Sequence, residues 1–126
     1  MILHLAKHQL KPGVTVIVLK GSIHAGTDCR RLELEVDKLI EVKTALVIFD
    51  FGQITHIDSS AIGSLVRSYT QLKKSGGLLR LAGIKGMLEG TLKLTKVDKL
   101  IEVFPTAAAA AENFVVPGSG ASPEKA

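Results

Sequence analysis

The chain has 126 residues, enough for one domain with a hydrophobic core, and 46% of them are apolar, as in globular proteins. Its net charge is +4, but the basic residues are interleaved with acids and only 4% of the residues are aromatic. We therefore expect no direct nucleic-acid interface built on a basic patch and stacking rings. Cys29 is the only cysteine, which excludes an internal disulfide and fits a reducing cytoplasm.

No apolar run reaches the roughly 18 residues that a membrane-spanning helix needs. The opening stretch, MILHLAKHQLKPG, is too short and too polar for a secretory signal. The sequence therefore predicts a cytoplasmic protein without a membrane span.

The N-terminal part predicts two strands and a helix. The strands are Ile2–Ala6 and the β-branched run Val14–Leu19, with a turn at Lys11-Pro12-Gly13 between them. After a loop between Gly21 and Gly26, Thr27 is expected to cap a helix of about 15 residues. One face of this helix is apolar and the other carries mixed charges that we expect to be solvated: Cys29, Leu32, Val36, Leu39 and Ile40 against Arg31, Glu33, Glu35 and Lys38.

The central stretch predicts a buried strand, a short polar loop and a second helix. Residues Ala45–Phe49 form a nearly unbroken apolar run, which is typical of a strand covered on both faces. The helix is expected to begin at Asp58-Ser59-Ser60, with Asp58 as its N-cap. Two serines would then lie at a helix N-terminus, whose free N–H groups can hold an anion, including a phosphate on a serine placed there.

The remaining chain predicts alternating short elements. Gly76-Gly77 ends the second helix and Leu78–Ala82 is a strand. A third helix is expected within Ile84–Leu94, an edge strand within Leu100–Phe104, and an alanine-rich helix from Pro105-Thr106 to about Asn113. Strands that alternate with helices indicate an α/β fold with parallel crossovers over residues 1–114. Residues 115–126 are small, polar and rich in Pro, Gly and Ser, so we expect a flexible tail.

The segment from His56 to Ile84, and the order of the elements, resemble the STAS domain. This family includes bacterial anti-sigma factor antagonists and the cytoplasmic tail of sulphate transporters. The resemblance covers about residues 1–114, and its most specific part is Asp58-Ser59-Ser60-Ala61-Ile62-Gly63, against the family pattern Asp-Ser-Ser/Thr-Gly-Leu/Ile-Gly. It implies a small mixed sheet of four to five strands with about four helices mainly on one face.

The resemblance also implies a function without catalysis or a cofactor. In antagonists of this family, the first serine after the aspartate is phosphorylated by a serine kinase that is also the anti-sigma factor, and a phosphatase reverses the change. By that correspondence Ser59 is the phospho-acceptor, with Ser60 as the second candidate. The expected partner-binding surface around it consists of Asp58, Ser59, Ser60, Ala61, Ile62, His24 and Thr27.

Two departures from the family pattern keep an alternative open. Ala61 replaces a glycine and adds a methyl group where a kinase would approach. In the segment Gly21-Ser22-Ile23-His24, an imidazole stands where antagonists commonly carry an acid. The alternative is a STAS accessory subunit of a membrane transport complex or signalling scaffold that is never phosphorylated.

Other interpretations of these residues rest on spacing without the resemblance. Spacing alone favours serines that merely occupy a helix start capped by Asp58, and the phospho-acceptor role comes from the resemblance. A catalytic triad of Ser59, His56 and Asp58 is not expected, because residues so close in sequence rarely converge and no Gly-x-Ser-x-Gly turn surrounds the serine. The four histidines lack metal-ligand spacing, and no phosphate-binding loop is present. Cys29 is expected to be a small buried residue.

Overall fold

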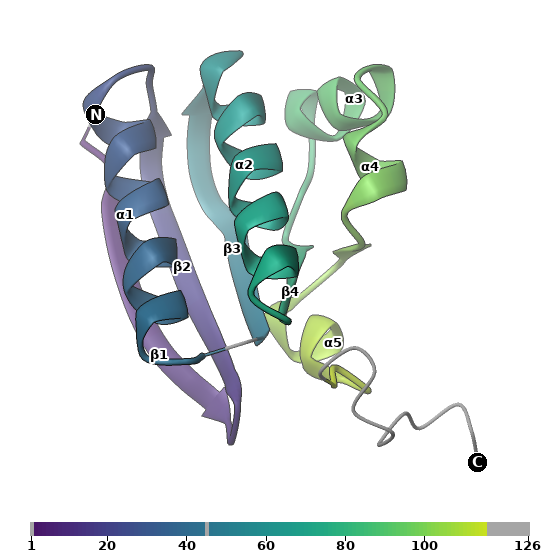
Figure 1. Cartoon of the computed structure of the whole chain (residues 1–126). Coiled ribbons are helices and arrows are strands. Elements are labelled where there is room, and N and C mark those ends of the chain that lie inside the picture. Colours follow the sequence, from purple (N-terminus) through teal and green to yellow (C-terminus); the bar gives the residue numbers. More distant parts are fainter. Residues whose placement is uncertain (1, 45, 116–126) are drawn as a thin grey trace.

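The computed structural model of the chain describes residues 2–44 and 46–115, and within them five strands form one mixed sheet (Figure 1). The strands lie in the sheet in the same order as in the sequence. Strand β1 is antiparallel to β2, and all other neighbouring strands are parallel. The strands are β1 (His4–Lys11), β2 (Val14–Ile23), β3 (Leu46–Ile57), β4 (Leu78–Ala82) and β5 (Val103–Phe104).

The helices of the described residues cover the two faces of the sheet unequally. They are α1 (Thr27–Glu41), α2 (Ser60–Lys74), α3 (Met87–Leu94), α4 (Val97–Leu100) and α5 (Ala107–Ala111). Buried residues of α1, α2, α3 and α4 share the larger core with one face of the sheet. Helix α5 packs on the opposite face. The predicted α/β architecture, with helices mainly on one face, is therefore confirmed.

Strand β3 is the centre of the core, as its apolar run predicts. Its side chains alternate between the two faces, because successive residues of a strand point in opposite directions. Val47 and Phe49 belong to the larger core, whereas Leu46 and Ile48 belong to the smaller core under α5. All four are buried. Both faces of this strand therefore exclude water, which is why alternation of polar and apolar residues is absent there.

The strands on either side of the site are longer than the sequence predicts. Strand β2 continues through Gly21 to Ile23, and β3 continues to Ile57, where a loop was expected. Polar residues interrupt the apolar pattern in these extensions, but the two strands still pair there, up to Ile23 opposite Ile57. Strand β1 likewise covers His4–Lys11 rather than Ile2–Ala6, because pairing with β2 continues to the turn at Pro12-Gly13.

The C-terminal part departs from the prediction at one element. Leu100 ends a short helix, α4, instead of beginning an edge strand. This helix follows Lys96, which adopts the left-handed conformation with φ of 64°. A lysine gives no sequence signal for this conformation, which mainly Gly, Asn and Asp adopt. Strand β5 is therefore only Val103–Phe104. The expected tail at 115–126 lies, apart from Val115, outside the described residues.

The charged face of α1 is less solvated than predicted. The Arg31 guanidinium donates a hydrogen bond to the carbonyl of Leu3 at 2.7 Å. Glu33 accepts one from the Ser64 hydroxyl of α2 at 2.6 Å. These partly buried contacts join α1 to the residue before β1 and to α2, so the charged residues help to position the helix.

Candidate functional site

Ser59 lies at the junction between the end of β3 and the start of α2. Its backbone is already helical, with φ of −64° and ψ of −22°, and its side chain makes no capping hydrogen bond to the helix. The residue is exposed. By contrast, the Thr106 hydroxyl accepts from the Ala109 N–H and caps α5. The Ser59 hydroxyl therefore has no role in the helix start that a modification would disrupt.

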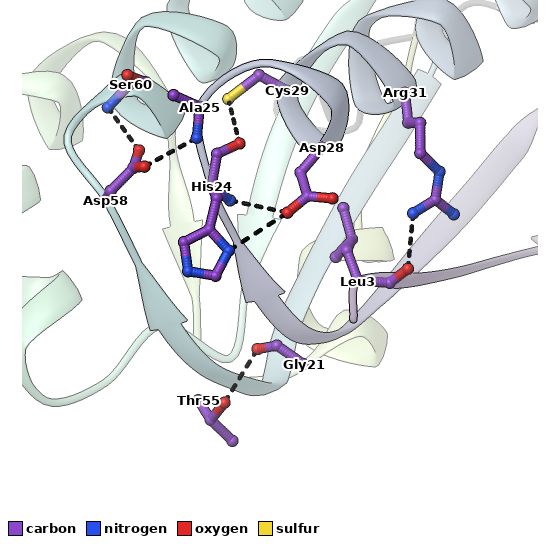
Figure 2. A network of polar contacts seen from close by, with 10 residues as sticks. All are labelled: Leu3, Gly21, His24, Ala25, Asp28, Cys29, Arg31, Thr55, Asp58 and Ser60. Atoms are coloured by element: carbon purple, nitrogen blue, oxygen red, sulfur yellow. Dashed lines mark hydrogen bonds and ion pairs between the residues drawn. The ribbon is translucent and has the colours of Figure 1, made fainter. Parts of the chain in front are cut away.

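The carboxylate of Asp58 fastens this junction to the loop before α1 (Figure 2). One oxygen accepts from the backbone N–H of Ala25 at 2.8 Å, and the other from the N–H of Ser60 at 2.9 Å. The bond from Ala25 is the largest cause that lowers the pKa of Asp58, followed by the bond from Ser60 and the charge of nearby His24. Asp58 is therefore ionised at neutral pH and holds two segments distant in sequence together.

The free N–H groups expected at the start of α2 already have partners. The Ser60 N–H donates to the Asp58 carboxylate, the Ala61 N–H to the Asp58 carbonyl at 3.1 Å, and the Ile62 N–H to the Ser59 carbonyl at 3.2 Å. Ser59, rather than Asp58, occupies the N-cap position, although Asp58 performs the predicted capping bond. The helix start thus offers a phosphate on Ser59 few backbone donors, and the phosphate would remain on the surface.

His24 lies beside this junction with a carboxylate partner of its own (Figure 2). Its backbone N–H donates to Asp28 at 3.0 Å, and its imidazole Nδ1 is 3.5 Å from the same carboxylate oxygen. Its ring centroid is 5.8 Å from that of His56. Thr27 is not the cap of α1 as predicted, because the helix begins at Thr27 and Gly26, with φ of 83°, takes the cap position.

Most of the predicted partner-binding residues are at least partly exposed at this junction, but Ala61 is buried. Ser59, Ser60, His24 and Thr27 are exposed, and Asp58 and Ile62 are half-buried. Ala61 is 1% exposed and belongs to the core. The prediction that its methyl group faces an approaching kinase is therefore wrong, because that methyl group packs inward against the sheet.

The hydrogen bonds of Asp58 argue against a triad of Ser59, His56 and Asp58. A triad would need Asp58 to orient a histidine ring, but its oxygens accept from the Ala25 and Ser60 N–H groups. Among the described residues no group of three or more His, Cys, Asp or Glu side chains is placed to hold a metal ion. In the same part of the chain, no helix has the length and apolar character to span a membrane.

Sequence reasoning missed the two contacts that shape the loop before α1. Asp28 could have been found, because it follows His24 by four residues and lies in the first turn of a helix, where acids are favourable. The bond between Ala25 and Asp58 could not, since it joins residues 33 apart in the chain through a backbone N–H that carries no sequence signal.

Several solved structures have the same fold. An anti-sigma factor antagonist from Mycobacterium paratuberculosis matches with a TM-score of 0.76 and 20% identity, over 86% of this chain and 91% of that one. Unphosphorylated SpoIIAA matches with a TM-score of 0.65 and 16% identity, over 85% of this chain and 92% of that one. Phosphorylated SpoIIAA from Bacillus matches with a TM-score of 0.68 and 15% identity, over 85% of this chain and 96% of that one.

A sulfate transporter family protein from Wolinella succinogenes is similar as well, with a TM-score of 0.70 and 23% identity over 82% of this chain and 85% of that one. At such identities the likeness shows the fold. No curated protein matches the sequence. The family model for the STAS domain matches residues 6–110, most of the chain, and the chain therefore belongs to the STAS domain family.

Proposed function

We propose that this STAS domain is a regulator of the anti-sigma factor antagonist type that binds a serine-kinase anti-sigma factor and is switched by phosphorylation of Ser59. The observation that carries the proposal is the exposed Ser59, whose side chain takes no part in capping α2 and which follows directly on the fixed Asp58 carboxylate. A serine phosphatase would return it to the binding state. The neighbouring anti-sigma factor antagonist structures support the same kind of function.

The physical effect of phosphorylation follows from the surroundings of Ser59. A phosphate adds about 1.5–2 negative charges at neutral pH. The first N–H groups of α2 are already bonded to Asp58 and Ser59 oxygens, so they do not neutralise the added charge. A partner that packs on this surface would have to remove water from a dianion beside the Asp58 carboxylate, at a large cost in free energy. Binding would be lost while the fold stays intact.

On this proposal the chain acts by binding and not by catalysis. It competes with a sigma factor for the anti-sigma factor and so controls transcription in the bacterial cytoplasm, with no direct contact to nucleic acid. The contact surface consists of the exposed residues Ser59, Ser60, His24 and Thr27 and of half-buried Ile62. The Asp58 carboxylate holds the loop before α1 against the start of α2.

The proposal is tested by using four forms of the chain as bait in extracts of its own cells. The wild type and Ser59→Ala should recover a serine-kinase anti-sigma factor, and Ser59→Asp should not. Thr70→Asp is the matched control and should recover the kinase, because it places the same charge on an exposed hydroxyl residue further along α2, outside the contact surface. Equal recovery by Ser59→Ala and Ser59→Asp would contradict the switch.

His24 favours one alternative. Its imidazole, in contact with Asp28, stands where antagonists of the family commonly carry an acid, and the fold is also that of a sulfate transporter family protein. The alternative is an accessory STAS subunit of a transport complex or scaffold whose surface is used constitutively. In the same experiment, all four baits would then recover a permease or scaffold protein to a similar extent.

A further inference from the structure

Strand β3 has an open edge next to the candidate site. Its pairing with β4 ends where Asp50 lies opposite Ala82, but β3 continues to Ile57. Between Gln53 and Ile57 its other edge is still paired with β2. Within the described residues no strand lies along the edge that β4 leaves. An uncovered strand edge offers backbone N–H and C=O groups that can pair with a further strand.

A hollow of about 310 Å³ lies between this stretch and the start of α3. Phe51, Ile54 and Leu88 give it apolar walls, and Ile57 lines it immediately before Asp58. Met87 stands at its rim with 91% of its surface exposed. Methionine is flexible and adapts to varied apolar partners. The hollow is therefore suited to an apolar side chain, and it adjoins the surface around Ser59.

The backbone at Gly83 and Gly52 marks the point where the open edge of β3 begins. Gly83 follows β4 with φ of 72°, and a Cβ atom there would lie 2.7 Å from the backbone nitrogen of Gly52. The Gly52 N–H is bonded to the Asp50 carboxylate at 2.9 Å, and its carbonyl accepts from the Lys85 ammonium at 3.2 Å. The chain after β4 thus stays close to β3 as far as Gly52, and no described strand pairs with the rest of this edge.

The charge of the hollow is of one sign. Lys85 carries a positive charge, and no Asp or Glu is among the described residues that line it. The lysine ammonium lies on the strand edge because it bonds the Gly52 carbonyl. A ligand that lies along this edge would meet a cation at one end and apolar walls beyond it, so a carboxylate next to an apolar side chain is complementary.

We propose that the open edge of β3 and the hollow together form a groove that binds an extended acidic segment of a protein partner. The segment adds as a strand to the edge, places an apolar side chain in the hollow and pairs a carboxylate with Lys85. Strand addition derives its affinity from backbone hydrogen bonds and its specificity from pockets for alternate side chains. Ser59 does not line the groove, so the proposal goes beyond the proposed switch, and its test on the unphosphorylated chain can fail or hold independently of it.

The test begins with a phage-displayed library of random octapeptides selected on the immobilised full chain. The enriched sequences should share apolar residues alternating with Asp or Glu. A synthetic peptide of the enriched sequence should shift the amide NMR signals of residues 51–57 and 85–91. Loss of one charge-assisted contact predicts that Lys85→Glu weakens this peptide about tenfold or more. A version of the peptide with Lys in place of its acids should bind Lys85→Glu better than the wild type.

Matched variants separate the groove from general effects of charge or hydrophobicity. Met87→Asp should weaken binding, whereas Leu94→Asp should not, although Leu94 lies on the same helix and is 84% exposed. Lys99→Glu, an exposed lysine outside the hollow, is the control for Lys85→Glu. Unchanged melting temperatures would show that each variant folds. No enriched sequence, enrichment without acids, or equal losses in the control variants would overturn the proposal.

Discussion

Arg80 joins α5 to the sheet, and its replacement by methionine is expected to destabilise the protein substantially. Its guanidinium donates to the carbonyls of Ala110 at 2.9 Å and Glu112 at 3.1 Å, and it stacks on Phe104 and Phe114 at 4.9 Å and 4.3 Å from the ring centroids. The Arg80 side chain is only 12% exposed. One side chain therefore holds the end of β5, α5 and the residues after it.

The magnitude follows from these contacts. A hydrogen bond to a charged group contributes about 1.5–3 kcal/mol, and a cation–π contact about 0.5–1 kcal/mol at a partly exposed site. The ion pair of Arg80 with Glu102 adds little, because Glu102 is 62% exposed. The contacts share one guanidinium and do not add, and methionine retains part of the packing. The expected net loss is therefore about 2–4 kcal/mol for Arg80→Met.

Urea unfolding followed by circular dichroism measures this loss, with Arg67→Met as the matched control. Arg67 is also paired with a glutamate, at 3.3 Å, but its side chain is 56% exposed, so its loss should cost less than about 1 kcal/mol. Amide hydrogen exchange should also accelerate in α5 of Arg80→Met before it does in α2. Equal stability of the two variants would refute the anchoring role of Arg80.

Three further predictions concern Asp58 at the site, the turn at Gly83 and Gly63 in α2. Because the folded-state pKa of Asp58 is depressed, its contribution to stability is present above the unfolded pKa and is lost as pH falls through the folded pKa. Asp58→Asn should therefore be less stable than the wild type at pH 7, and the difference in urea midpoint should shrink below about pH 4. A difference that does not change with pH would contradict this. Gly83→Ala should destabilise by about 2 kcal/mol or more in thermal or urea unfolding, since its φ is 72° and the new Cβ would meet the Gly52 backbone. Gly63→Ala in α2, where a Cβ meets nothing within 4 Å, should instead stabilise by about 0.5–1 kcal/mol.

The sequence predicts those parts of the fold that periodicity governs. The spacing of apolar residues, and glycines that mark the ends of elements, predict α1, α2, the buried part of β3 and β4. The extension of β3 through Gln53, Ile54 and His56 does not, because polar residues break the pattern, and pairing with β2 extends the strand there. The short α4 depends on a left-handed lysine, which sequence patterns do not mark.

For the candidate site, the chain position of Ser59 could be predicted but its surroundings could not. The Asp58-Ser59-Ser60 sequence correctly indicates a helix start next to a carboxylate. The inward direction of Ala61 and the bond from Ala25 depend on how α2 packs on the sheet and on which loop lies opposite. The open edge of β3 depends on β4 ending at Ala82, a property of two strands together rather than of either one.

The central claim, that Ser59 is a regulated phosphorylation site, is tested most directly by phosphopeptide mapping of the protein isolated from its own cells, in growth and under stress. The claim predicts phosphate on Ser59 whose occupancy changes between the two conditions. Consistent absence of phosphate from a fully covered Ser59 peptide, in both conditions, would contradict it and favour a surface that is used constitutively.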